Sequence, residues 1–346
     1  MTRAAALTAV TPPPSEDIEA QLERRLGRLH AHQRLGIERH HEAQIFGQGL
    51  RFFHFENLLF SHFLIEAALR LSGLYWQGRR NAAKIELRYN EIFSPRLPEE
   101  FDGYLILHLS DLHWDMSEPA MEALLGLLPR IDYNLCVITG DYRGKTAGPF
   151  DRALAGMARL GAALTTPVYG VLGNHDTIRM VPGLEKIGIR MLLNESVVIE
   201  HGRQRIYVSG VDDAHFYRVD NLEKAAADIP RDAFSIILTH TPEIYLQCAH
   251  AGFDVLFSGH THGGQICLPG GIPLTLDSPL LPRAYGSGAW RYKNMAGYTS
   301  AGAGSSVAPV RFNCPPEITL HRLCLKRREE ASVRAVSQVQ RVKRPR

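Results

Sequence analysis

From residue 104 onward, short apolar runs alternate with longer segments whose apolar positions recur at helical spacing. The runs lie at residues 105–110, 135–139, 168–172, 235–239 and 254–257, and helical segments include Glu118 to Leu128 and Phe150 to Leu160. Uninterrupted apolar runs bounded by polar residues are typical of strands buried on both faces. Their alternation with helices predicts an α/β fold.

A different pattern precedes this region. Between residues 85 and 90, apolar and polar residues alternate strictly, which is typical of a strand with one face in water. Pro95 and Pro98 then mark a loop. We therefore place an N-terminal extension at residues 1–98, with a disordered start, amphipathic helices and this leading strand. The main domain follows at residues 99–325.

The most apolar part of the extension is residues 50–76. Within it His62, Glu66 and Arg70 stand four positions apart, so on a helix they form a polar stripe. The segment is amphipathic and too polar to span a membrane. Two interpretations stay open: a helix packed on the main domain, and an interfacial helix in a membrane surface with Trp76 near its end.

Residues with metal-binding side chains follow each of the five apolar runs. In chain order these are Asp111-Leu112-His113, Gly140-Asp141, Gly173-Asn174-His175-Asp176, His240 and Gly259-His260-Thr261-His262. Because α/β sheets bind ligands beyond the carboxyl ends of their strands, we expect these side chains to meet at one site. Extended backbone in the last motif would send its two imidazoles to the same side.

Each fragment alone is also a common turn sequence, but the order of the five is specific. The series Asp-x-His, Gly-Asp, Gly-Asn-His-Asp, His, Gly-His-x-His resembles that of the calcineurin-like metallophosphoesterases, from Tyr104 to Leu325. The form Gly-His-Thr-His-Gly-Gly-Gln and the later segment Pro316 to Leu320 are similar to a bacterial branch of that superfamily. This branch includes membrane-associated phosphoesterases and a lipid A pathway pyrophosphatase.

The resemblance implies a four-layer α/β/β/α sandwich of two mixed sheets flanked by helices, with a helical N-terminal extension. It also implies two divalent metal ions at the strand ends. The first ion would be held by Asp111, His113 and His262, the second by Asn174, His240 and His260, with the two carboxylate oxygens of Asp141 bridging both. Carboxylate, imidazole and amide ligands suit Mn, Fe or Zn.

The resemblance also implies the catalytic roles. A water between the metals would lose its proton near neutral pH and act as the nucleophile. His175 would stabilise phosphate charge and protonate the leaving oxygen, with Asp176 orienting or charging it. For Arg143 two interpretations stay open. It would either donate a bidentate hydrogen bond to phosphate oxygens or form a salt bridge at the rim of the site.

Composition and charge narrow the alternatives. The 346 residues are 45% hydrophobic and 22% charged, as in an ordinary globular protein. The net charge of +3 is uneven, because residues 326–346 hold eight Lys/Arg and two Glu, a local +6. We expect this basic tail to be disordered, and we expect no specific nucleic acid binding. The five widely spaced cysteines argue against disulfides and structural zinc.

Three functions follow from these observations. The first is a phosphoesterase that cleaves a phosphodiester, phosphomonoester or pyrophosphate of a small soluble molecule. The second is a pyrophosphatase for a lipid-linked nucleotide, of the UDP-diacylglucosamine type, at the inner membrane surface. The third is a non-catalytic regulatory module that binds metals. Neither a secretory signal nor a membrane span is predicted, so we expect a cytoplasmic protein, with peripheral membrane contact in the second case. No Gly-x-Ser-x-Gly elbow or Gly-Lys-Ser/Thr phosphate loop is present, which argues against a serine hydrolase and ATP-driven chemistry.

Overall fold

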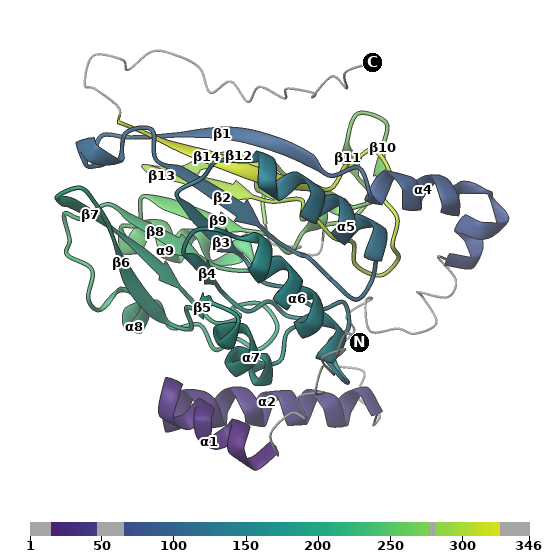
Figure 1. Ribbon diagram of the computed structural model, residues 1–346, viewed down its shortest axis with the longest axis horizontal. Helices are drawn as coiled ribbons and strands as arrows, with labels where there is room; N and C mark the ends of the chain where they lie inside the picture. The colour runs from purple at the N-terminus through teal and green to yellow at the C-terminus, as the bar shows by residue number, and fades with distance from the viewer. Residues whose placement is uncertain (1–14, 47–65, 277, 279–280, 326–346) are drawn as a thin grey trace, which may run out of the picture.

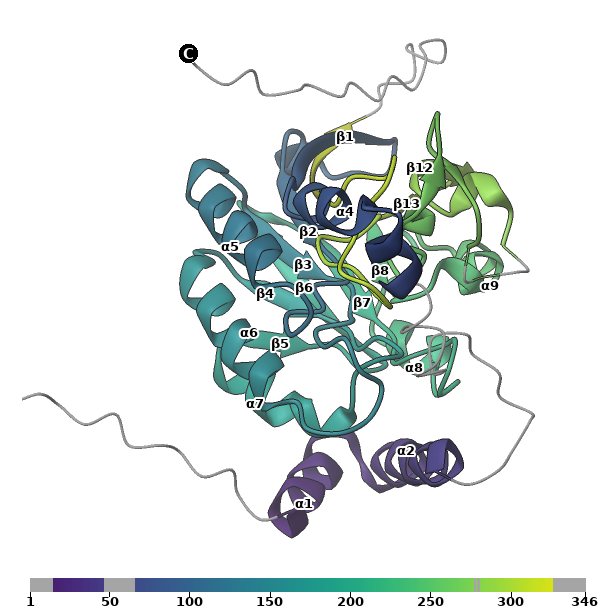
Figure 2. The ribbon, with the colours of Figure 1, turned by 90° about the vertical axis from the view of Figure 1, so that its right-hand side faces the viewer.

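Two six-stranded sheets pack face to face in the computed structural model, which describes residues 15–46, 66–276, 278 and 281–325. The strand order is β1-β14-β2-β3-β4-β5 in the first sheet and β12-β13-β9-β8-β7-β6 in the second. Helices cover the outer face of each sheet (Figures 1 and 2). The predicted fold class, a four-layer sandwich of two mixed sheets, is confirmed.

The first sheet contains three of the predicted buried strands. Its members are β1 (Glu86–Ser94), β14 (Glu317–Leu325), β2 (Leu105–Leu109), β3 (Leu135–Ile138), β4 (Val168–Gly170) and β5 (Ile189–Met191). Strands β2 to β5 are parallel, whereas β14 is antiparallel to β2 and parallel to β1. Because β1 forms the edge, it has the alternating pattern seen in the sequence. It pairs along its whole length with β14, although we placed it in the extension.

The second sheet contains the other two predicted strands. Its members are β12 (Gly288–Tyr292), β13 (Met295–Thr299), β9 (Val255–Ser258), β8 (Ser235–Leu238), β7 (Gln204–Gly210) and β6 (Glu195–His201). Strands β7, β8, β9 and β13 are parallel neighbours, with β6 and β12 antiparallel at the two edges. A short hairpin of β10 (Cys267–Leu268) and β11 (Ile272–Pro273) stands apart from both sheets.

The apolar core has three layers. Between the sheets, Ile106, Val137 and Val171 pack with Val208, Ile236 and Phe257. Helices α5 (Glu118–Leu127), α6 (Asp151–Ala163) and α7 (Val181–Lys186) cover the first sheet, and α8 (Leu222–Ala226) and α9 (Tyr245–Ala251) cover the second. In α6, for example, Ala153, Met157 and Leu160 are buried, which is the spacing of a helix with one apolar face.

Two imidazoles interrupt the apolar layer between the sheets. His108 on β2 and His321 on β14 are fully buried, and the His321 ring stacks on Phe257 with the ring centroids 4.3 Å apart. Burial lowers the pKa of His108 to about 3. Burial and the neighbouring His108 hold the pKa of His321 well below its usual value. Both rings are therefore neutral in the folded protein at physiological pH.

The N-terminal extension begins with a helical pair below α7 (Figure 1). Helices α1 (Ser15–Leu26) and α2 (Arg28–Phe46) meet at Gly27, whose φ of +86° suits glycine. Leu22, Leu26 and Leu35 enter the core layer outside the first sheet. This part of the extension is therefore packed on the main domain.

The predicted helix at residues 50–76 falls largely outside the described residues, which resume at 66. Residues 66–71 are helical, but Gly73 has φ +73° and separates them from α4 (Leu74–Ala82). The prediction of a single helix that continues to residue 76 is therefore wrong at its end, because the chain turns at Gly73. Helix α4 packs on the loop before β14, where Gly78 faces Val310 and Phe312. No helix of the described part combines the length and apolar character needed to cross a bilayer.

The other predictions for the chain ends lie outside the described residues. The predicted disordered start includes residues 1–14, and the basic tail is residues 326–346. The domain boundary at residue 98 stays a prediction.

Candidate metal centre

The five strand ends that carry the candidate residues meet between the two sheets. The loops after β2, β3 and β4 come from the first sheet, and those after β8 and β9 from the second. Across the sheets, His240 Nδ1 lies 2.7 Å from the carbonyl oxygen of Thr139. All seven predicted metal ligands are buried. The side chains that follow the five strands therefore meet at one place, between the strand ends of the two sheets.

Most of these ligands have a backbone conformation that residues other than glycine rarely adopt. Five of the seven have φ between +40° and +72°, namely Asp111, His113, Asp141, His260 and His262. Such strained residues cluster at functional sites. The extended backbone expected for the last motif is wrong, because both histidines are left-handed and His262 begins a short 3₁₀ turn (His262–Gly264).

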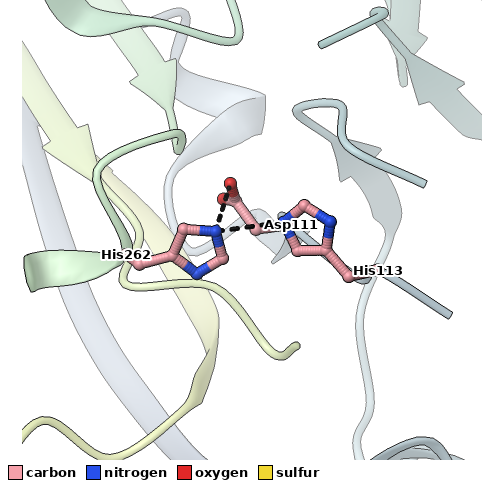
Figure 3. Close-up of side chains that lie close together, drawn as sticks. All are labelled: Asp111, His113 and His262. Carbon is pink, nitrogen blue, oxygen red and sulfur yellow. Dashed lines mark hydrogen bonds and ion pairs between the residues drawn. The ribbon is translucent and has the colours of Figure 1, made fainter. Parts of the chain in front are cut away.

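The first group of predicted ligands consists of Asp111, His113 and His262, which point toward one another (Figure 3). His262 Nε2 lies 3.0 Å from His113 Nε2 and 3.5 Å from Asp111 Oδ1. All three side chains are buried, so the atoms that converge here are shielded from solvent.

The second group consists of Asn174, His240 and His260. Asn174 Oδ1 lies 2.9 Å from His240 Nε2 and 3.0 Å from His260 Nδ1. Asp141 lies between the groups, with its Oδ2 atom 3.3 Å from His240 Nε2 and 3.6 Å from His113 Nε2. Its Oδ1 atom accepts the His175 backbone N–H at 2.9 Å. One oxygen therefore faces both groups, where we expected two.

These distances fit metal coordination. Metal–ligand bonds of about 2.0–2.2 Å place neighbouring ligand atoms about 3.0–3.5 Å apart around one ion. Both His113 and His240 place Nδ1 at 2.7–2.8 Å from a backbone carbonyl oxygen. A carbonyl only accepts, so Nδ1 carries a proton and Nε2 is the atom that would bind a metal.

His262 differs from His113 and His240, because a guanidinium and not a carbonyl oxygen lies beside its Nδ1 atom. Arg311 Nη2 lies 3.1 Å from its Nδ1 atom, and a guanidinium only donates. A neutral ring that accepts at Nδ1 carries its proton on Nε2. Binding a metal through Nε2 would therefore require this proton to move to Nδ1 or to leave the ring.

Asp141 and His240 stabilise each other's charge. Burial opposes a charge on Asp141, but the imidazoles of His240, His175 and His113 hold the pKa of its carboxyl well below the usual value. Burial also disfavours a charged His240, yet Asp141 raises the pKa of that imidazole to about 10. Burial, together with the Asp141 charge, raises the pKa of Asp111 to about 6. Divalent cations neutralise such close carboxylates.

Glycines leave the space that the ligands occupy. A Cβ on Gly259 would overlap Ser110 Oγ and Asp111 Oδ2, and one on Gly173 would overlap the Asp141 carboxylate. The glycines of the motifs are therefore required by close approach of the loops to Asp111 and Asp141.

His175 lies beside the predicted ligands and faces Asp141. Its Nδ1 atom is 2.8 Å from the carbonyl oxygen of Gly144, and its Nε2 atom is 3.9 Å from Asp141 Oδ2. Since the carbonyl holds the proton on Nδ1, a proton donated from Nε2 would come from the imidazolium. Together with His113 and Asp141, His175 also forms a group that could hold a metal ion.

The Asp176 carboxylate binds the backbone of two loops. It accepts backbone N–H groups of Asp141, Tyr142 and Gly173 at 2.8–2.9 Å, and of Arg143 at 3.4 Å. These contacts join the loops after β3 and β4. A hydrogen bond to the His175 ring is not among these contacts, so the orientation of that ring by Asp176 stays a prediction.

Arg143 is buried and holds a loop. Its guanidinium donates to the carbonyl oxygens of His175, Thr146 and Gly148 at 2.6–2.9 Å. The predicted salt bridge at the rim is absent from the described residues. A direct bidentate hydrogen bond from Arg143 to phosphate would require some of these three hydrogen bonds to break.

Several residues of the site were missed in the sequence. Ser110 Oγ donates to Asp111 Oδ2 at 2.6 Å, Thr139 Oγ1 donates to Ser110 at 2.7 Å, and His108 Nε2 lies 2.8 Å from Thr139 Oγ1. Arg311 also donates to the backbone carbonyl of His262 at 3.0 Å. Ser110 was detectable as the polar residue that ends its run. The sequence around Arg311 gave no indication that this residue contacts the site.

Comparisons with known proteins agree with this site. Residues 104–264 match the family model described as calcineurin-like phosphoesterase. The uncharacterized metallophosphoesterase YkoQ of Bacillus subtilis is 30% identical over 227 residues, which cover 63% of this chain and 83% of that protein. The phosphodiesterase YaeI of Escherichia coli is 27% identical over 236 residues, which cover 64% of this chain and 82% of that protein.

Among solved structures, the NAD nucleotidase NadN of Haemophilus influenzae is similar to this chain. The similarity covers 58% of this chain and 45% of that one, with 18% sequence identity and a TM-score of 0.39. A TM-score this low adds no argument, so the fold rests on the two sheets themselves.

Proposed function

Because the chain belongs to the calcineurin-like phosphoesterases and is a metal-dependent phosphoester hydrolase, we propose that it hydrolyses phosphodiesters of small soluble molecules at a centre of two divalent transition-metal ions. Phosphomonoesters and pyrophosphates are further substrates of the same chemistry. Family membership favours an enzyme over the non-catalytic module. The relative YaeI, named as a phosphodiesterase, supports the choice of ester.

One observation carries the two-metal proposal. Asp141 Oδ2 lies within 3.3–3.6 Å of an imidazole nitrogen in each of the two ligand groups. We assign Asp111, His113 and His262 to one ion and Asn174, His240 and His260 to the other, with Asp141 shared. When bound, two such ions supply an activated water and neutralise phosphate charge.

The remaining roles belong to side chains around this centre. We propose that His175 protonates the leaving oxygen from Nε2, because the carbonyl of Gly144 keeps the other nitrogen protonated. Asp176 and Arg143 form hydrogen bonds with the backbone of the surrounding loops, and these bonds hold Asp141 and His175 in position relative to each other.

Replacement of Asp141 by Asn tests the proposal. The amide lacks the negative charge that both ions need, so hydrolysis of a bis-aryl phosphodiester with added Mn²⁺ should fall to background, and elemental analysis should find fewer than two ions per chain. Asp132→Asn makes the same change of charge at an exposed loop residue and serves as the control. Near-normal activity and metal content in Asp141→Asn would refute the two-metal assignment.

A second candidate, hydrolysis of a lipid-linked nucleotide pyrophosphate at a membrane, is favoured by an exposed apolar surface. Leu71, Leu74 and Trp76 lie at or just before the start of α4, and Leu268, Ile272 and Leu274 on or beside the β10–β11 hairpin. Residues 310–313 join the two elements, because Arg311 N–H donates to Gly78 and Cys267 N–H to Phe312. Exposed apolar patches of this kind mark partner or membrane surfaces.

Vesicle binding separates the two candidates. If the surface contacts lipid, Trp76→Ser with Ile272→Ser should reduce co-sedimentation with anionic vesicles and slow cleavage of an acylated nucleotide pyrophosphate. Hydrolysis of the soluble diester should stay unchanged. Equal co-sedimentation of the variant and the original chain would exclude a membrane role for this surface.

A further inference from the structure

We infer that helix α2 of the N-terminal extension positions the loop that carries His175 and Asp176, through the side chains of Arg34 and Glu38. The family match begins at residue 104, so this helix lies outside the matched region. The inference rests on the proposed hydrolysis at the metal centre. It makes the extension a part of the active site instead of an appendage.

Arg34 contacts the loop directly. Its side chain is fully buried, and Nη2 donates to the carbonyl oxygen of Asp176 at 2.9 Å. The guanidinium lies over the ring of Tyr217, 3.2 Å from the ring centroid, and Nε is 3.4 Å from Asp212 Oδ1. The planar cation is therefore fixed by a hydrogen bond, an aromatic face and a carboxylate.

Glu38 contacts the next two residues of the same loop. One carboxylate oxygen accepts Thr177 Oγ1–H at 2.6 Å, and the other accepts the Ile178 backbone N–H at 2.7 Å. Arg34 and Glu38 stand four positions apart on α2, so they face the loop together. Three consecutive loop residues, 176 to 178, are thus held by two side chains of one helix.

This anchor connects the catalytic loop to the second sheet. The loop at residues 173–178 follows β4 of the first sheet, and Asp212 and Tyr217 follow β7 of the second. Arg34 contacts both. The Asp176 carboxylate in turn accepts the backbone N–H of Asp141. A displacement of the loop would therefore move His175 and the carboxylate shared by both ligand groups.

The extension offers an internal control for a merely structural role. Arg25 of α1 also makes long-range contacts, to Glu185, Glu195 and the Met191 carbonyl. These contacts fix the extension to α7 and its neighbours, away from residues 176–178. Loss of Arg25 should therefore weaken the packing of the extension without moving the catalytic loop.

Kinetics of three variants of the full chain test the inference. In Arg34→Lys, an ammonium cannot keep the stacked, forked geometry, so kcat for a soluble bis-aryl phosphodiester with Mn²⁺ should fall about 10- to 100-fold, as for a small misplacement of catalytic groups. KM and the metal content should change little, since no ligand is replaced. Glu38→Gln should lower kcat in the same direction. Arg25→Lys should keep kcat near that of the original chain.

The assays are run well below the melting temperatures of all variants, and a poorer alkyl leaving group is included. A positioning role predicts a larger kcat loss for the alkyl ester, because His175 is displaced. Normal kcat in both Arg34→Lys and Glu38→Gln would overturn the inference, as would an equal kcat loss in Arg25→Lys. If Arg34→Lys does not fold, Glu38→Gln alone decides by the same comparison. An original chain without metal-dependent hydrolysis would instead overturn the proposed function, and the inference with it.

Discussion

Replacement of Asp176 by Asn changes one oxygen of a carboxylate that holds two catalytic loops together. Its Oδ2 atom accepts the N–H groups of Asp141 and Gly173, both at 2.8 Å, and Oδ1 accepts those of Tyr142 at 2.9 Å and Arg143 at 3.4 Å. An amide has a single acceptor oxygen. The favoured rotamer keeps this oxygen at the Oδ2 position and turns the NH₂ group toward the other two donors.

The cost follows from these contacts. One good hydrogen bond and one long one are lost, and a buried donor left unsatisfied costs about 1–3 kcal/mol. The neutral amide avoids the burial penalty that, with the Asp141 charge, raises the pKa of Asp176 to about 6. We therefore expect a net loss of about 2 kcal/mol in the free energy of unfolding, which lowers the melting temperature of a chain this long by about 3 °C, at roughly 2.1 cal/mol/K of unfolding entropy per residue.

Calorimetry at pH 8, where Asp176 is ionised, measures this effect against the surface control Asp132→Asn. Turnover of the bis-aryl phosphodiester should also fall, because the Asp141 loop moves. The outcome separates two roles of Asp176. An unchanged melting temperature with lost turnover would refute the structural reasoning and support the role predicted from the sequence, orientation of His175.

Three further predictions concern the proton donor, the buried imidazoles and the metals. His175→Ala should keep both metals by elemental analysis but lose about 10²–10⁴ in turnover, with a smaller loss for aryl than for alkyl esters; loss of metal would make His175 a ligand. Because the folded-state pKa of His108 is lowered from 6.5 to about 3, its contribution to stability is complete above pH 6.5 and is lost as the pH falls, by about 1.4 kcal/mol per pH unit. Urea unfolding below pH 6.5 should show at least this slope, since the lowered pKa of His321 adds to it, and His108→Gln should make it shallower; equal slopes would contradict the assignment. Chelation of the metals should lower the melting temperature, since Asp111 and Asp141 are then unneutralised, and added Mn²⁺ should restore it; a chelator without effect would argue against tight binding.

Local patterns predicted the strands and the residues at their ends, because a buried run and the polar residue after it are neighbours in the chain. The alternation at residues 85–90 correctly indicated the edge strand β1 for the same reason. Near Gly73 the pattern failed, because one glycine with positive φ turned a continuous amphipathic segment into two helices.

The tasks of Asp176 and Arg143 were not visible in the sequence. Both side chains bind backbone groups, which every residue possesses, so no partner residue type indicates the contact. Arg34 and Glu38 have the spacing of an ordinary pair on a solvated helix. Only the packing of α2 against the loop after β4 distinguishes them from such a pair.

Strand β14 has a consequence for how the protein is made. It lies inside the first sheet between β1 and β2, and its His321 contacts Asn90 across 231 positions of sequence. A chain emerging from the ribosome has all seven predicted ligands by residue 262, but β2, which leads into Asp111, keeps an unpaired edge until residues 317–325 emerge. Such an edge is prone to mispairing. We therefore expect the pairing of β2 to be a late step of folding, and a nascent chain stalled before residue 317 would expose the unpaired edge of β2 beside the predicted metal centre.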